Sequence, residues 1–258
     1  MLTAIREIVQ YRSLLRDLVA RDLKVRYKRS VLGVAWTMLN PLLMMIVFTM
    51  VFSQFMRVPV EHFAVYFLSG FLLWNFVAQT TSWSTGCLLG YASLIKKIYV
   101  PKAIFVLATV IAGFVNLVIS LVPLALIMLV VGHPFRASLG FVPVPMLLGM
   151  LFALGLSLLL APLSVMFADI VPIYQVVQTL WLYLTPVMYP AAMVPPEYRA
   201  IVDANPMTYF VEAFRAPIYG GTLPDAGVLL GATAFALGAV VLGWIVFEHY
   251  TDRIAYYV

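Results

Sequence analysis

The chain alternates between long apolar stretches and short polar ones. Residues 1–29 are rich in charge, whereas six later stretches are almost continuously apolar. A helix of roughly 20 apolar residues is long enough to cross the hydrocarbon core of a bilayer. The pattern therefore predicts an all-α membrane protein with a short head and a transmembrane domain over residues 30–258. Its six spans are expected at about 31–56, 63–86, 103–131, 142–168, 171–190 and 225–247.

The first 29 residues have the pattern of a basic amphipathic helix. Apolar residues recur near helical spacing, and eight arginines and lysines occupy much of the remainder. Such a helix lies in the plane of the membrane interface, with its apolar stripe in the acyl boundary and its cations near anionic headgroups. We expect the interface contacts to come from Arg16, Arg21, Lys24 and Arg26.

Composition supports a membrane protein over a soluble one. The chain is 64% apolar and 10% charged, whereas soluble domains are roughly 45–50% apolar and 25% charged. The net charge of +5 could suggest nucleic acid as a partner, but the basic residues gather beside expected membrane spans.

The single cysteine, Cys87, excludes an internal disulfide and a cysteine-based metal cluster. It is expected to be a small apolar residue at a helix end.

The distribution of basic residues predicts the orientation. Eight lie in the head, three in the loop after the second span and one in the C-terminal tail, against four on the other side. Basic residues favour the cytoplasmic side of a membrane. We therefore expect a multi-pass protein of the cytoplasmic (inner) membrane with both termini in the cytoplasm. An even number of spans agrees, because it places both termini on the same side.

The loop between the second and third spans contains a candidate contact surface. Residues 91–99 mix apolar and basic side chains between Gly90 and Pro101, which favours a short cytoplasmic helix. One interpretation is a helix that couples the membrane domain to a partner; the alternative is a basic anchor that only fixes orientation. The candidate coupling residues are Tyr91, Leu94, Ile95, Lys96, Lys97, Ile98 and Tyr99.

The segment 191–223, before the last span, predicts two short extracytoplasmic helices. Pro195-Pro196-Glu197 can begin the first helix. Asn205 can cap the second, with Pro206 at its first helical position. The second helix carries aromatic residues and is expected to rest on the outer leaflet or dip into it as a re-entrant helix.

Several kinds of chemistry are missing from the sequence. No charged residue lies in the middle of an expected span, so an ion-driven carrier is not indicated. No phosphate-cradling glycine loop is present, so the chain is not expected to hydrolyse nucleotide. His62, His133 and His249 flank spans and form no metal-binding or catalytic motif. We expect a non-catalytic membrane subunit without cofactor or metal, whose energy comes from a partner ATPase.

Several motifs along the chain resemble a known family. The run from Arg21 to Gly33, followed by Trp36 and Leu39-Asn40-Pro41-Leu42, resembles the membrane subunit of ABC-2 type permeases that export O-antigen, capsule or teichoic acid polysaccharides. The stretches 184–190 and 205–209, with Phe214-Arg215, resemble the same family. The resemblance covers essentially the whole chain. It implies a homodimer bound to two nucleotide-binding ATPase subunits that hold ATP and Mg, and a glycan cargo on a polyprenyl diphosphate lipid.

The resemblance also directs attention to aromatic residues as a sugar path or gate. Rings can stack on passing sugars, but aromatic residues in membrane proteins also face lipid or form interfacial belts. Likewise, the rings of residues 209–214 either form an outer gate or only anchor their loop at the interface. The candidates for the path or gate are Trp36, Trp74, Trp181, Tyr209, Phe210 and Phe214.

Two other functions remain open at the level of sequence. One is an ABC-2 permease for a drug or a small lipid, which would share the fold. The other is a membrane enzyme of lipid-linked sugar metabolism, which would need clustered polar or metal-binding residues at the membrane face. Genes for an ATPase and for glycosyltransferases beside this one would favour glycan export.

Overall fold

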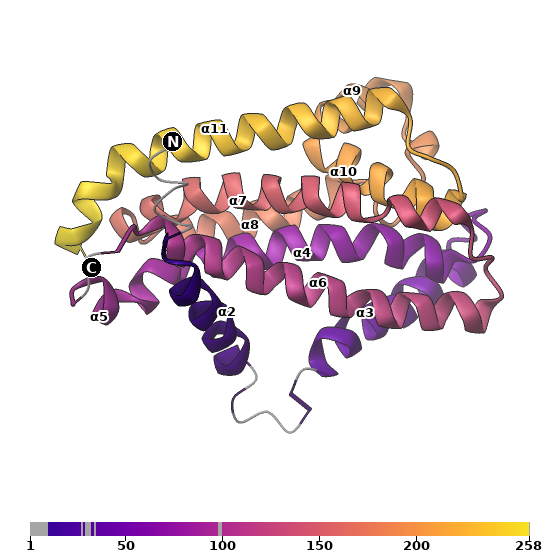
Figure 1. Ribbon diagram of the computed structural model, residues 1–258. Helices are drawn as coiled ribbons and strands as arrows, with labels where there is room; N and C mark the ends of the chain where they lie inside the picture. The colour runs from indigo at the N-terminus through magenta and orange to yellow at the C-terminus, as the bar shows by residue number, and fades with distance from the viewer. Residues whose placement is uncertain (1–9, 27, 29–31, 34, 98–99, 258) are drawn as a thin grey trace.

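A computed structural model describes residues 10–26, 28, 32–33, 35–97 and 100–257, and the regular structure in these residues is helical (Figure 1). Two helices of π type, η1 and η4, and two of 3-10 type, η2 and η3, accompany the α-helices. In chain order the elements are α2 (Arg12–Arg26), α3 (Ala35–Phe48), η1 (Thr49–Phe55), α4 (Phe63–Gly90), α5 (Ala92–Ile95), α6 (Ala103–Val131), η2 (Ala137–Phe141), α7 (Pro143–Met166), α8 (Ile170–Leu184), η3 (Ala191–Met193), α9 (Pro196–Ala204), α10 (Pro206–Arg215), η4 (Ala216–Gly220) and α11 (Ala226–Tyr257).

Five helical segments are long and apolar enough to cross a membrane. They are Ala35–Phe55, Phe63–Gly90, Ala103–Val131, Ala137–Met166 and Ala226–Thr251. These segments correspond to the first four expected spans and the sixth, which confirms an all-helical protein with several membrane-spanning helices. The count of six spans stays a prediction, because the fifth expected span is shorter than the others.

The expectation of a fifth helix over 171–190 was wrong at its C-terminal end. Helix α8 has 15 residues and ends at Leu184, followed by extended backbone at Thr185. Pro186 explains this end, since proline disfavours helical backbone at the residue before it and has no N–H to donate. A helix of this length is about 22 Å long, less than the hydrocarbon thickness of about 30 Å.

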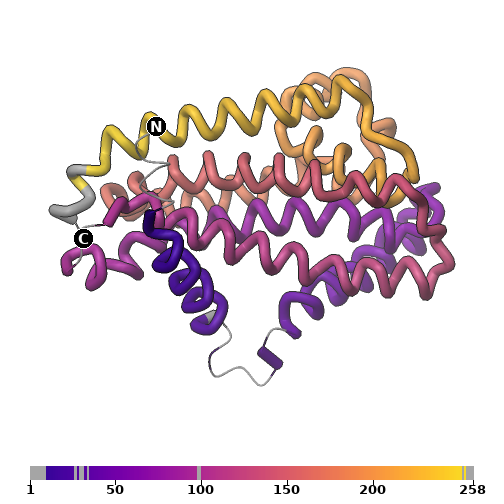
Figure 2. The backbone as a smooth tube through the Cα atoms, viewed as in Figure 1, coloured from indigo at the N-terminus to yellow at the C-terminus, as the bar shows by residue number. Residues whose placement is uncertain are grey.

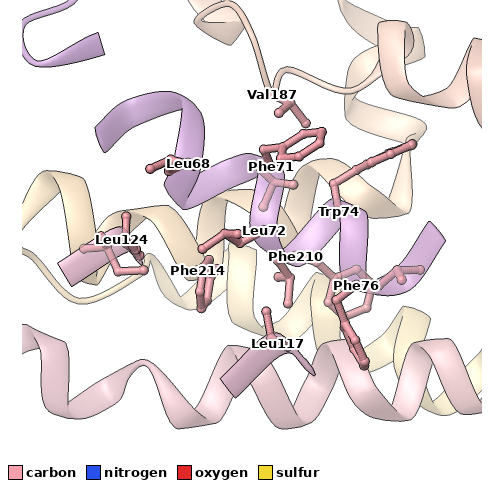
Figure 3. Packing of buried hydrophobic residues seen from close by; sticks show 14 of the residues in the cluster. Leu68, Phe71, Leu72, Trp74, Phe76, Leu117, Leu124, Val187, Phe210 and Phe214 are labelled. Carbon is pink, nitrogen blue, oxygen red and sulfur yellow. The ribbon is translucent and has the colours of Figure 1, made fainter. Parts of the chain in front are cut away.

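Helix α4 is the central helix of the bundle. In its most apolar window 78% of the residues are buried, a larger share than in any of the other four candidate spans. Helices α3, α6, α7, α8 and α10 all contact it. Figure 3 shows Leu68, Phe71 and Leu72 of α4 packed among side chains from the surrounding elements. Much of α4 is therefore shielded from lipid by the chain itself.

Helices α7 and α11 make the most extensive helix–helix contact. Gly155 of α7 lies against the backbone at Ala239 of α11, and Gly243 lies against the backbone of Gly155. A Cβ at either glycine would overlap these backbone atoms. Small residues let two membrane helices approach this closely, and α11 lies along α7 for much of its length (Figure 2).

The bundle has two distinct ends. The start of α2, all of α5 and the end of α11 lie at one end, which we call the α5 end (Figure 1). The Lys102 ammonium at the start of α6 donates a hydrogen bond to the Thr251 carbonyl near the end of α11. Helices α9 and α10 lie at the other end, the α10 end (Figure 1).

Candidate functional site

At the α5 end, helix α2 packs on α6 through a second apolar cluster, separate from the main core. Leu18 of α2, Leu88 of α4 and Phe105 of α6 are among its buried members. Cys87 is buried in the same cluster, within the last turn of α4, which agrees with the expected small apolar residue at a helix end. The cluster joins the amphipathic head to the ends of two long helices, and we call this region the α2–α5 junction.

A buried polar contact lies inside the α2–α5 junction. The Tyr91 hydroxyl donates a hydrogen bond to the Asp22 carboxylate, and the Thr109 hydroxyl lies 3.3 Å from the second carboxylate oxygen. The Arg21 guanidinium sits 4.7 Å from the centre of the Tyr91 ring. Burial raises the pKa of Tyr91, and the hydrogen bond to Asp22 and its negative charge raise it further. Tyr91 therefore stays protonated and able to donate at neutral pH.

The expected helix over 91–99 is shorter in the structure. Helix α4 continues to Gly90, and only one turn, α5, follows it before a bend at Lys96 and Lys97. Ser93, Lys96 and Lys97 are exposed, whereas Leu94 and Ile95 are half-buried against the apolar cluster of the α2–α5 junction. Ile98 and Tyr99 lie outside the described residues.

The candidate interface residues of α2 have exposed side chains where the structure describes them. Arg16, Arg21 and Lys24 are exposed, while Leu18 on the opposite face is 3% exposed. Arg26 is the last residue of α2, and its side chain lies outside the described part of the chain. The amphipathic pattern is therefore present in α2, and contact with lipid headgroups stays a prediction.

At the α10 end, the Asn205 side chain joins the end of α8 to the start of α10. As expected from the sequence, its side chain caps α10 by accepting a hydrogen bond from the Met207 N–H at 3.0 Å, and Pro206 follows at the first helical position. The same side-chain oxygen accepts from the Trp181 indole at 2.7 Å, and the amide donates to the Thr185 hydroxyl at 2.9 Å. The end of α8 is thus fixed to the start of α10.

Arg215, which the sequence offered only as an outer basic residue and as part of the family resemblance, is half-buried and joins several segments at the α10 end. Its guanidinium donates hydrogen bonds of 2.9 Å to the carbonyls of Pro186 and Val187 and one of 3.0 Å to the Tyr66 hydroxyl. It also lies 3.8 Å from the centre of the Tyr66 ring. Burial lowers the pKa of Arg215. No motif could reveal this role, because two of its three hydrogen-bond acceptors are backbone carbonyls remote in sequence.

The six aromatic residues proposed for a path or gate do not gather in one place. Phe210 and Phe214 are fully buried in the main core, and Trp74 is nearly so (Figure 3). Tyr209 is half-buried and packs against Phe235 at 5.5 Å between ring centres. Trp181 is half-buried and engaged with Asn205, whereas Trp36 is 48% exposed. In this conformation the faces of Phe210 and Phe214 are covered by the chain itself.

Trp36 belongs to a cavity that sequence reasoning did not identify. The cavity lies between α3, α4 and α6, has a volume of about 290 Å³, and is lined by uncharged residues. They are Trp36, Thr37, Asn40, Pro41, Leu72, Asn75, Phe76, Gln79, Thr80, Trp83, Gly113, Asn116, Leu117 and Ser120. The separation of these residues over three helices explains why no local motif revealed the site. We call it the α3–α4–α6 cavity.

Helix α8 presents a polar stripe on its exposed side. Gln175, Thr179 and Tyr183, spaced one turn apart, are all exposed. The adjacent side binds α4: the Tyr174 hydroxyl donates to Thr81 at 2.7 Å, and Gln178 accepts a hydrogen bond of 2.8 Å from Ser82. The neighbouring exposed residues of α8 are apolar, as expected for a helix in a membrane.

Nearly the whole region from α2 to η4 matches a protein-family model. Residues 13–219 match the model described as "ABC-2 type transporter". The chain belongs to the ABC-2 type transporter family. The α2–α5 junction, the α3–α4–α6 cavity, α8 and the α10 end all lie within the matched residues, whereas α11 lies beyond them.

Curated proteins similar to this ABC-2 family member are polysaccharide export permeases or inner-membrane export proteins by name. The chain is 33% identical over 256 residues to the O-antigen export system permease protein RfbA of Myxococcus xanthus, covering 98% of this chain and 97% of that protein. It is 26% identical to the protein of the same name from Klebsiella pneumoniae, over 91% of both chains. It is 22% identical to the capsule polysaccharide export inner-membrane protein CtrC of Neisseria meningitidis, over 81% of this chain and 80% of that protein.

Proposed function

We propose that this protein is the membrane subunit of an ATP-driven ABC exporter that moves a lipid-linked polysaccharide, of the O-antigen, capsule or teichoic acid type, across the cytoplasmic membrane. The observation that carries the proposal is the 33% identity to an O-antigen export permease over 98% of this chain. A match of that extent includes the head, all candidate spans and the α10 end. It favours a polysaccharide cargo over a drug or a small lipid.

Energy is proposed to come from two copies of a separate ATPase subunit that bind ATP and Mg. The α5 end is the surface we assign to these partners, because α5 and the exposed basic side of α2 lie there together. Ten of the chain's 16 arginines and lysines lie in segments that reach this end or precede α2. Their enrichment supports a cytoplasmic α5 end in the inner membrane, with both termini on that side.

We propose that α8 is a sixth, short span. The end of α7 lies beside the end of α4, where the Ser164 hydroxyl donates to the Thr85 carbonyl. The end of α8 is bound to Asn205 at the α10 end. Helix α8 therefore leads from one end of the bundle to the other, although it has only 15 residues. Helices α9 and α10 would follow as re-entrant helices before α11 returns the chain to the α5 end.

The polar stripe of α8 supports a homodimer with an export path beside this helix. Gln175 and Thr179 are exposed in an otherwise apolar helix. An amide facing hydrocarbon has no solvent to bind, so polar side chains at this depth usually face protein or water. We place a second copy of the chain, or the aqueous route between two copies, on this face. Tyr183 on the same stripe could offer its ring to a sugar.

The experiment that tests the proposed function combines a deletion with affinity purification. Deleting the gene should remove the surface glycan while lipid-linked glycan accumulates inside the cell, and a plasmid copy should restore the surface glycan. The purified tagged protein should retain an ATPase subunit, and the complex should contain two copies of each chain. Unchanged surface glycan in the deletion strain would refute the proposed cargo.

A further inference from the structure

The α3–α4–α6 cavity combines neutral hydrogen-bonding groups with aromatic rings. Three kinds of side chain in its lining are unusual for the interior of an apolar bundle. Hydroxyl groups come from all three helices, and indole rings come from Trp36 and Trp83. Side-chain amides come from Asn40, Asn75, Gln79 and Asn116. None of the lining residues is ionisable at neutral pH. Groups of this polarity are costly in a membrane unless they bind protein, water or a ligand.

Helix α4 arranges its share of the lining on one stripe. Asn75, Gln79 and Trp83 are spaced four residues apart and so lie above one another on the helix surface. The Gln79 amide donates a hydrogen bond of 3.0 Å to the Asn75 side-chain oxygen. This bond orients the pair and leaves the Asn75 amide N–H groups and the Gln79 carbonyl without another protein partner among the described residues. The stripe therefore offers one donor group and one acceptor group side by side.

A third polar group lies deeper in the cavity. Thr80 is fully buried, and its hydroxyl oxygen has no hydrogen-bond partner in the described part of the chain. It lies against Gly113 of α6, where a Cβ would overlap that oxygen. The Thr80 hydroxyl therefore fills the space that a side chain at position 113 would take. A buried hydroxyl without a partner is uncommon in proteins and points to a group that binds there.

These features match the chemistry of a sugar. Each sugar hydroxyl both donates and accepts a hydrogen bond, which suits the paired amide groups of Asn75 and Gln79, and the C–H faces of a sugar ring pack on indoles. A volume of about 290 Å³ corresponds to on the order of ten water molecules, which is room for one sugar ring. The uncharged lining does not suit a diphosphate. Trp36 and Asn40 are exposed, so the cavity opens beside α3.

We propose that the α3–α4–α6 cavity is a saccharide-binding site that holds one neutral sugar unit of the cargo glycan during export. This inference rests on the proposed function, because it takes the cargo to be a glycan. It adds a site within each subunit, lined by α3, α4 and α6 and not by the polar stripe of α8. A lipid acyl chain is the competing occupant, and the experiment distinguishes the two.

The direct test is site-specific photo-crosslinking in cells that make the native glycan. A p-benzoylphenylalanine replaces Trp83 in the cavity, and in the control it replaces Val122, which is 49% exposed on the other side of α6. The permease–ATPase complex is arrested with vanadate before illumination. We expect the Trp83 position to capture material that stains for carbohydrate and keeps this stain after mild acid cleaves the glycan from its diphosphate lipid, and the Val122 position to capture only phospholipid. Capture of phospholipid alone at both positions would overturn the proposal.

A pair of near-isosteric variants provides a second readout. Asn75→Leu combined with Gln79→Met removes the polar pair while keeping its volume, and Thr233→Val on α11 is the control, because that hydroxyl bonds only its own helix backbone at Leu229. We expect the double variant to need about two- to tenfold more lipid-linked glycan for half-maximal export, as the loss of one or two hydrogen bonds implies. Abundance and ATPase binding should match the control. An unchanged half-maximal concentration in a fully assembled double variant would refute the site.

The outcomes separate this inference from the proposed function. If deletion of the gene abolishes surface glycan but the cavity captures none, the saccharide site is wrong and the export function stands. If deletion leaves surface glycan unchanged, the proposed function itself fails.

Discussion

The Tyr91 hydroxyl hydrogen-bonds the Asp22 carboxylate across 69 residues of sequence. Tyr91 lies between the end of α4 and the single turn of α5, and Asp22 lies in the C-terminal half of α2. Tyr91 is buried in the apolar cluster of the α2–α5 junction, and Asp22 is half-buried beside it. A displacement of α5 by a bound ATPase would therefore act on α2 and α4 together.

Removing the Tyr91 hydroxyl should weaken this link without removing the ring. Tyr91→Phe leaves the half-buried Asp22 carboxylate with one fewer donor, a loss on the order of 1 kcal/mol. We expect the assembled exporter to hydrolyse ATP at near-normal rates but to export less glycan per ATP. The measurement is the ratio of glycan export to phosphate release in reconstituted complex.

Tyr11→Phe is the matched control for Tyr91→Phe. Tyr11 is half-buried beside the same apolar cluster, near the start of α2. Its variant should leave the ratio unchanged. A normal ratio in Tyr91→Phe, with the protein fully assembled, would contradict a role for the Tyr91–Asp22 contact in transmission.

The exposed side of α5 should bind the ATPase. Ser93, Lys96 and Lys97 are exposed there, so Lys96→Glu with Lys97→Glu should reduce ATPase co-purification while the permease remains inserted. Leu94→Asp should instead lower stability, because Leu94 packs on the apolar cluster of the α2–α5 junction and burying a charge is costly. Co-purification and thermal unfolding in detergent measure the two effects separately.

A neutral pair of substitutions distinguishes coupling from simple anchoring. Lys96→Gln with Lys97→Gln removes the charges that would fix orientation without introducing repulsion. Inverted topology in this variant, together with normal ATPase binding by the Glu pair, would favour the anchor interpretation and reject the coupling surface.

Cysteine labelling should place Ser13 and Thr222 on opposite sides of the membrane. Both side chains are exposed, and the native Cys87 is buried and contributes little background. In intact cells, after the outer membrane is permeabilised, an impermeant maleimide should label Ser13→Cys poorly and Thr222→Cys well. Equal labelling of both from outside would contradict an even number of spans with a cytoplasmic α5 end.

The rings of α10 should differ sharply in their importance for stability. Phe214 is fully buried, and Phe→Ala in a packed core typically costs on the order of 3–5 kcal/mol. Phe214→Ala should therefore lower the unfolding temperature and the membrane abundance. Tyr209→Phe, which keeps the half-buried ring, should leave both near normal. A stable Phe214→Ala variant that leaks small solutes would instead support a gate built from this ring.

The sequence predicted the long helices well because their signal is local. Continuous apolar stretches fixed the third span at 103–131, which agrees with α6, and the Asn205 cap followed from two adjacent residues. The expected fifth span, 171–190, extends past the end of α8 because the sequence stays apolar after Leu184. Pro186 ends the helix there. In each case the start or end of the helix depends on residues that lie within a few positions of it.

The contacts that shape the candidate sites could not be predicted because they join distant segments. His62 and His133 flank different spans, yet their rings lie 5.5 Å apart at the α10 end. Arg215 binds carbonyls of 186 and 187, and Thr80 meets Gly113 across two helices. Such pairs follow from helix packing, which no single stretch of sequence specifies.

Reconstitution gives the most direct test of the central claim. The protein and its ATPase are placed in proteoliposomes that contain the lipid-linked glycan, and a glycan-cleaving enzyme outside reports the molecules that have crossed. With ATP and Mg supplied on the ATPase side, the account predicts that the glycan fraction accessible on the other side rises with time. This rise should disappear with a non-hydrolysable ATP analogue. Robust ATP hydrolysis by a correctly oriented complex, with no change in glycan accessibility, would contradict the account.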